Sequence, residues 1–169
     1  MDKYWNKIKD QNYLKESLSL IREILPKQSS ILDVGTGPTL YLNRISADYN
    51  ITALDKGEHE IWKQLAKNII QCRLDFFQLN PGFQFDLIMA LECLEHIAEM
   101  QKKEFIDRLF DHSKKYVLIS LPYMWKASKT KGHIGITKEI ILSWFDREPA
   151  RSKLILDNEI HRILNLYIK

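Results

Sequence analysis

The hydrophobic pattern divides the chain into short apolar runs and longer stretches with helical spacing. The apolar runs are typical of strands covered on both faces and occupy residues 31–34, 51–54, 72–74, 85–90 and 116–121. The stretches with helical spacing are residues 4–25, 40–48, 58–70 and 92–112. Because strands that alternate with helices pair in parallel, the pattern predicts an α/β fold, a Rossmann-like three-layer sandwich.

The C-terminal part departs from this alternation. Thr137 can cap a helix that runs to about Phe145, and residues 153–156 and 162–168 look like two strands around a turn at 157–159. This hairpin adds an antiparallel element to a mostly parallel, seven-stranded sheet. Since no repeat or low-complexity tract interrupts the pattern, we expect a single domain over residues 1–169, with residues 1–27 as an N-terminal helical lid.

Composition narrows the class of protein. The chain has 169 residues, of which 45% are hydrophobic, enough for one well-packed core. No apolar run is long enough for a membrane span, and the N-terminus lacks a signal-peptide layout. Its two cysteines, Cys72 and Cys93, lie in apolar segments without zinc-binding spacing, which favours free thiols and a cytoplasmic location. The net charge of +3 neither demands nor excludes an anionic partner, and no pattern predicts an oligomeric state.

A glycine-rich turn follows the first predicted strand. Residues 31–34 lead directly into Gly35, Thr36 and Gly37, where glycine lets the backbone bend sharply and a ligand approach closely. Asp33 is an acid inside this apolar strand. A buried carboxylate needs donors, and we expect backbone N–H groups of the turn to supply them. The alternative is that the strand ends early and Asp33 is exposed.

Two further acids follow the next strands. Asp55 ends the second predicted strand, where a carboxylate can accept two hydrogen bonds from ribose hydroxyls. Asp75 and Phe76 follow the third strand and could contact an adenine, although Phe77 competes with Phe76 for that role. The ordinary alternatives are a solvated acid and core aromatics.

These features together resemble the class I S-adenosylmethionine-dependent methyltransferases. Residues 31–37 look like the family's first motif, and residues 85–96 match the fourth-strand signature of its small-molecule branch. The resemblance implies S-adenosyl-L-methionine as cofactor and methyl transfer to an oxygen or nitrogen of a small molecule, a carbohydrate or another metabolite. It implies these cofactor-binding residues: Asp33, Gly35, Thr36, Gly37, Asp55, Lys56, Asp75, Phe76 and Leu91. Thr39 stands where the family often has a third glycine.

A cluster of acids and a histidine follows the fourth strand. Glu92, Glu95 and His96 have i, i+3, i+4 spacing and are expected to share one helical face. We prefer His96 as a general base, with Glu92 in contact with substrate. A second possibility is a helix cap. A third is a divalent metal held by these three residues and His133, as in the RNA 3′-terminal ribose methyltransferases that this spacing also resembles; we expect no metal.

Aromatic residues near the predicted ligand rim are candidates for the substrate site. Tyr123 and Trp125 follow the fifth strand among lysines, a combination that suits a sugar or nucleotide, and His133 is a second candidate base. Tyr4 and Trp5 could close over the site, or could pack the first helix onto the core.

Two other classes of protein compete with a methyltransferase. A nicotinamide-dependent oxidoreductase would need glycine where Leu40 stands, and no Tyr-x-x-x-Lys pair is present. A catalytically silent partner subunit is the other, although such a protein need not keep a cofactor site. Among substrates, nucleic acid is possible, but the slight positive charge favours a small molecule.

Overall fold

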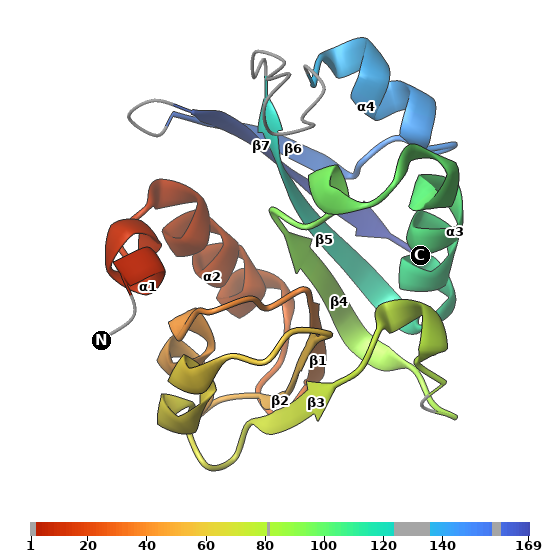
Figure 1. Cartoon of the computed structure of the whole chain (residues 1–169). Coiled ribbons are helices and arrows are strands. Elements are labelled where there is room, and N and C mark those ends of the chain that lie inside the picture. Colours follow the sequence, from red (N-terminus) through yellow and green to blue (C-terminus); the bar gives the residue numbers. More distant parts are fainter. Residues whose placement is uncertain (1–2, 81, 124–135, 157–159) are drawn as a thin grey trace.

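A seven-stranded sheet forms the centre of the molecule (Figure 1). The computed structural model describes residues 3–80, 82–123, 136–156 and 160–169. In the order of their places in the sheet, the strands are β3 (Ile70–Arg73), β2 (Asn50–Asp55), β1 (Ser30–Val34), β4 (Phe85–Leu91), β5 (Ser113–Tyr123), β7 (His161–Ile168) and β6 (Arg151–Leu156). In this sheet β7 runs opposite to the other six strands, so both of its pairings, with β5 and with β6, are antiparallel. The predicted Rossmann-like fold with an antiparallel C-terminal hairpin is confirmed.

Helices cover both faces of the sheet (Figure 1). Helices α1 (Lys3–Ile8) and α2 (Asn12–Ile24) lie on one face, and α3 (Glu99–Asp111) and α4 (Lys138–Trp144) lie on the other. Successive residues of a strand point to opposite faces, so Leu87 and Met89 join the core under α2 while Ile88 and Ala90 join the core under α3. Burial on both faces explains the continuous apolar runs in the sequence.

The predicted helices at 40–48 and 58–70 are wrong. Each crossover contains only a short 3₁₀ turn, η1 (Tyr41–Arg44) and η2 (Glu60–Gln64). The Asn43 side chain donates to the Gln64 carbonyl and accepts from the Ala66 amide. Asn68 likewise donates to the Ser46 carbonyl at 2.5 Å. Such side-chain bonds to backbone groups compete with helical hydrogen bonding and join the two crossovers instead.

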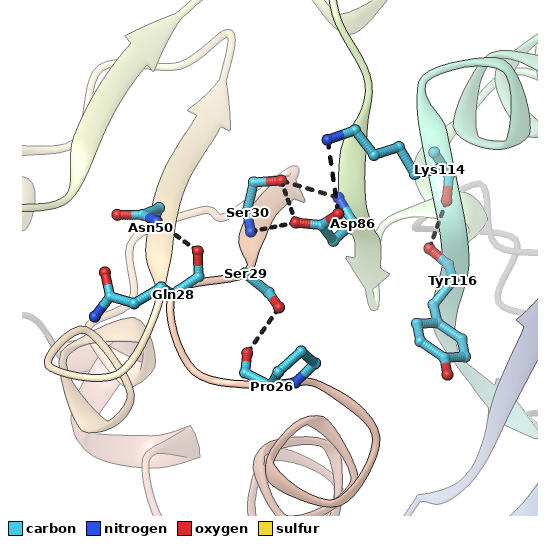
Figure 2. A network of polar contacts seen from close by, with 9 residues as sticks. Pro26, Gln28, Ser29, Ser30, Asn50, Asp86, Lys114 and Tyr116 are labelled. Carbon is cyan, nitrogen blue, oxygen red and sulfur yellow. Dashed lines mark hydrogen bonds and ion pairs between the residues drawn. The ribbon is translucent and has the colours of Figure 1, made fainter.

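A polar network ties together the strands at the end of the sheet where β1 and β4 begin (Figure 2). The backbone amide and the hydroxyl of Ser30 both donate to Asp86 Oδ2 at 2.8 Å, and Lys114 Nζ lies 3.7 Å from Asp86 Oδ1. Although burial opposes the effect, these bonds and the lysine charge hold the pKa of Asp86 below its usual value. The network joins β1, β4 and β5 at one end, so their carboxyl ends remain available for a site at the other.

Across the described residues, no helix is both long and apolar enough to cross a membrane.

Candidate active site

A cavity of about 600 Å³ opens at the carboxyl ends of β1, β2 and β4. Ligands bind at this edge in open α/β sheets, where the strand order reverses. The predicted site residues that line it are Tyr4, Gly35, Thr36, Gly37, Asp55, Lys56, Asp75, Phe76, Leu91, Glu92 and His96. The fold therefore brings together residues that are widely spaced in the sequence.

The glycine turn forms the cavity wall beside β2. The amides of Gly35 and Thr36 donate to the Leu54 carbonyl at 2.8 and 3.1 Å. Gly35 has φ +73°, and a Cβ built on it would lie 2.5 Å from Cys93 Sγ. A side chain there would be disfavoured by the backbone conformation and would force Cys93 to move.

Asp55 is held at the end of β2 by the turn and by its own loop. Its Oδ2 accepts from the Gly37 amide at 2.9 Å, and its Oδ1 accepts from the Gly57 amide at 2.7 Å. His59 Nε2 lies 3.2 Å from the same Oδ1. Sequence reasoning missed His59, although its place four residues after Asp55 was an available signal. These contacts fix the carboxylate while leaving part of its acceptor capacity for a ligand.

Asp33 is buried, as expected, but its partners differ from those predicted. The three amides of the turn are already bonded to Leu54 and Asp55, so they do not serve Asp33. The Asp33 carboxyl group instead lies beside the side chains of Tyr41 and Thr36. Thr36 Oγ1 donates to the Asp33 backbone carbonyl at 3.1 Å, and Asp33 Oδ2 has no hydrogen-bond partner among the described residues. Burial raises the pKa of Asp33 to about 7, and the neighbouring Tyr41 and Thr36 side chains oppose the rise. Asp33 is absent from the cavity lining, so it contacts the turn and not the cavity.

Asp75 and Phe76 also line the cavity and follow Leu74, whose amide donates to the Asp55 carbonyl at 3.1 Å. Asp75 caps the 3₁₀ turn η3 (Phe76–Gln78) by accepting from the Phe77 amide at 3.0 Å. Phe76 is buried and meets Phe105 edge-on, with ring centroids 5.1 Å apart. Phe77 lines the cavity as well, so the structure leaves both rings as candidates for an adenine contact.

The predicted helical face of Glu92, Glu95 and His96 is wrong. Glu92 directly follows β4 with φ +53°, and only Glu95 and His96 belong to the short 3₁₀ turn η4 (Leu94–His96). The Glu95 side chain is buried, whereas 62% of the His96 side chain is exposed. His96 Nε2 lies 3.9 Å from Glu95 Oε1 at the edge of the cavity.

Glu92 is engaged on both carboxylate oxygens. Ser120 Oγ donates to its Oε1 at 3.0 Å, and Arg162 Nε donates to its Oε2 at 2.8 Å. Burial and the nearby Glu92 charge raise the pKa of Glu95 to about 8. Within the described part of the chain, no group of three or more His, Cys, Asp or Glu side chains could hold a metal ion. His133 lies outside the described residues.

The remaining substrate candidates occupy different places. Tyr4 lines the cavity and is half exposed, which suits a position at its mouth. Trp5 is buried in the core under α2, with the Arg44 guanidinium 5.8 Å from its ring centroid. Tyr123 ends β5 and is absent from the cavity lining, and Trp125 lies outside the described residues.

This sheet, with a glycine turn after β1 facing an acid at the end of β2, defines the class I S-adenosylmethionine-dependent methyltransferase fold. The chain is 31% identical over 152 residues to the ubiquinone biosynthesis O-methyltransferase of Rickettsia prowazekii (strain Madrid E). The match covers 82% of this chain and 59% of that relative, so the chain spans about three fifths of the relative's length. No family model matches the chain.

Solved structures agree with the fold. The N-methyltransferase NodS from Bradyrhizobium japonicum WM9, in complex with S-adenosyl-L-homocysteine, superposes with a TM-score of 0.83 at 14% identity, covering 100% of this chain and 93% of NodS. A Burkholderia thailandensis 1,6-didemethyltoxoflavin-N1-methyltransferase, with its namesake compound and S-adenosylhomocysteine bound, gives a TM-score of 0.78 at 15% identity. That match covers 95% of this chain and 80% of the other.

Proposed function

We propose that this chain binds S-adenosylmethionine and transfers its methyl group to an oxygen or nitrogen of a small molecule, a carbohydrate or another metabolite. The observation that carries the proposal is the cavity in which the glycine turn and Asp55 meet through the Gly37 amide. The relative from Rickettsia prowazekii is named as an O-methyltransferase, which favours oxygen as the acceptor atom. The free thiols of Cys72 and Cys93 favour a cytoplasmic location.

The residues around the cavity suit the parts of this cofactor. Asp55 would accept from the ribose hydroxyls, and Asp75 with Phe76 would contact the adenine. The turn from Gly35 to Gly37 lines the cavity, and its two glycines present bare backbone where the amino-acid end would lie. Thr36, Lys56 and Leu91 also line the cavity, and we propose them as further cofactor contacts. When bound, the cofactor supplies a methyl group already activated for transfer by the positive charge on its sulfur.

The chain's own contribution is alignment and proton removal. Binding donor and acceptor in one cavity supplies proximity, which lowers the barrier without further chemistry. His96 is the base we propose for a hydroxyl acceptor, because its imidazole lies on the cavity wall beside the Glu95 carboxyl group. We propose residues 1–27 as the lid, with Tyr4 at the cavity mouth.

A transfer assay with methyl-labelled S-adenosylmethionine tests the proposal. The acceptors are 3,4-dihydroxybenzoate as a hydroxyl probe, glucosamine as an amino-sugar probe and a short RNA with a free 3′ end, each with and without EDTA. We expect label in a small molecule regardless of EDTA. Label confined to RNA and abolished by EDTA would instead support metal-assisted ribose methylation, and cofactor binding without any turnover would support a silent subunit.

His96→Gln tests the base. We expect kcat for the hydroxyl probe to fall by a factor of about 10² to 10⁴, with cofactor affinity unchanged within about twofold. An unchanged kcat would remove His96 from the mechanism.

A further inference from the structure

Arg162 is a buried cation that the proposed chemistry does not use. It lies on β7, is 6% exposed and is absent from the cavity lining. Its guanidinium contacts two residues that do line the cavity. Arg162 Nε donates to Glu92 Oε2 at 2.8 Å, and its Cζ lies 4.5 Å from the ring centroid of Tyr13. A single side chain therefore lies behind two parts of the cavity wall.

These contacts join elements that are distant in the sequence. Tyr13 belongs to α2, Glu92 follows β4, and Ser120 of β5 holds the other Glu92 oxygen. Arg162 Nη1 also donates to the Ile160 carbonyl at 3.4 Å, which anchors the guanidinium to the chain just before β7. The planar guanidinium can donate to a carboxylate while stacking on a ring, a combination that lysine does not reproduce.

Glu92 has a backbone conformation that non-glycine residues rarely adopt. Its φ of +53° is left-handed, and its amide donates to both the carbonyl and the hydroxyl of Ser120, at 3.1 and 3.0 Å. Such strain persists only where the surroundings over-determine it, and it concentrates at functional sites. The Arg162 contact is one of the restraints that hold the Glu92 side chain in this place.

We infer that Arg162 is a positioning residue for the methyl acceptor: it clamps Tyr13 and Glu92 together and so fixes the cavity wall formed by α2 and the end of β4. The inference rests on the proposed function for what the wall binds. The cofactor-binding residues we assign lie at the glycine turn, Asp55 and Asp75, and none of them contacts Arg162 in the described hydrogen bonds and ion pairs. Loss of the clamp should therefore affect the acceptor and leave the cofactor bound.

The test uses Arg162→Met, with Arg151→Met as the matched control. Arg151 lies on the same hairpin and also contacts α2, through Glu23 at 2.5 Å, but this pair is exposed and away from the cavity. Three quantities are measured: S-adenosylhomocysteine affinity by calorimetry, hydrogen exchange of residues 12–24 by mass spectrometry, and KM and kcat for 3,4-dihydroxybenzoate or whichever probe is methylated.

For Arg162→Met we expect the acceptor KM to rise at least about tenfold while kcat changes less than about threefold. Exchange in residues 12–24 should accelerate at least about tenfold, with S-adenosylhomocysteine affinity within about twofold of wild type. Arg151→Met should leave all three quantities within about twofold, because exposed pairs contribute little. Adding Glu92→Gln to Arg162→Met should bring the acceptor KM and the exchange rate part of the way back to their wild-type values, because no unpaired buried carboxylate remains.

The inference is overturned if Arg162→Met weakens acceptor and cofactor binding by the same factor, or if it changes neither KM nor exchange. If Arg162→Met does not fold, Arg162→Lys and the double variant replace it, and a wild-type KM in Arg162→Lys overturns the inference. If wild type methylates none of the probes, the proposed methyl transfer to a small molecule fails its test. The exchange measurement then decides alone, and unchanged exchange overturns the clamp.

Discussion

At the scale of single residues, Gly35 is constrained in two independent ways. Its φ of +73° disfavours any side chain, and Cys93 Sγ occupies the space that a Cβ would need. Gly82 also has a positive φ, +67°, yet no atom lies within 4 Å of its hypothetical Cβ. Alanine substitutions at these two glycines therefore distinguish the cost of a positive φ from the cost of the steric contact with Cys93.

We predict that Gly35→Ala is more destabilising than Gly82→Ala. The φ strain alone should cost about 1 kcal/mol in each variant, and the contact with Cys93 should add at least about another 1 kcal/mol at Gly35. Gly35→Ala should also weaken S-adenosylhomocysteine binding, whereas Gly82→Ala should not. Urea denaturation and calorimetry measure both effects, and equal losses in the two variants would contradict the role given to Cys93.

Individual residues also show how far sequence reasoning reaches. The position of Asp55 could be predicted from the sequence. An acid that ends one parallel strand lies at the same edge of the sheet as a glycine turn that follows the neighbouring strand. The surroundings of Asp33 could not be predicted, because its neighbour Tyr41 comes from a crossover that the pattern predicted as a helix. The Arg162–Glu92 ion pair joins β7 to the end of β4. These residues are far apart in the sequence, so no local spacing pattern predicts their contact.

At the scale of elements, strands were easier to predict than crossovers. From Leu87 to Leu91, β4 is a continuous apolar run because both faces are buried, and this signal is local. The helix at Lys138–Trp144 was predictable for a similar reason, since Thr137 caps it by accepting from the Ile140 amide at 3.4 Å. In η1 and η2, bonds between the two crossovers replace helical bonds, so their structure depends on tertiary neighbours.

We predict that α2 is held to the sheet by its apolar face rather than by surface charges. Leu18 is 2% exposed in the core under α2, and Leu18→Ala should cost about 2 to 5 kcal/mol of unfolding free energy. Lys153 pairs with Glu16 of α2 at 2.6 Å, but the pair is exposed. Lys153→Ala should therefore cost less than about 1 kcal/mol. Similar losses for both variants in urea denaturation would contradict this division.

At the scale of the whole molecule, buried carboxyl groups make stability depend on pH. Burial raises the pKa of Asp33 to about 7 and that of Glu95 to about 8, above their values in an unfolded chain. Between the unfolded and folded pKa values, the folded state binds more protons than the unfolded state. Stability therefore falls as pH rises through this window, because the group ionises in the unfolded state while it stays protonated in the folded state.

We predict that Asp33→Asn removes the Asp33 part of this dependence. Relative to the variant, the wild-type chain should lose on the order of 1 to 4 kcal/mol of unfolding free energy between pH 5 and pH 8. Asn has nearly the same shape as Asp and keeps a side-chain oxygen beside Tyr41 and Thr36, but it cannot ionise. Denaturant titrations of both proteins at the two pH values measure the difference, and parallel losses would contradict the buried, uncharged state of Asp33 at low pH.

The proposed cofactor site between the glycine turn and Asp55 is tested most directly by calorimetry of S-adenosylhomocysteine binding. Wild type should bind this ligand and not NAD. Asp55→Asn should weaken binding at least about tenfold, because a charged acceptor for the ribose hydroxyls is lost. Asp48→Asn, which removes a charge paired with Lys27 instead, should bind as wild type does. Equal affinities for wild type and Asp55→Asn, or tighter binding of NAD, would contradict the account.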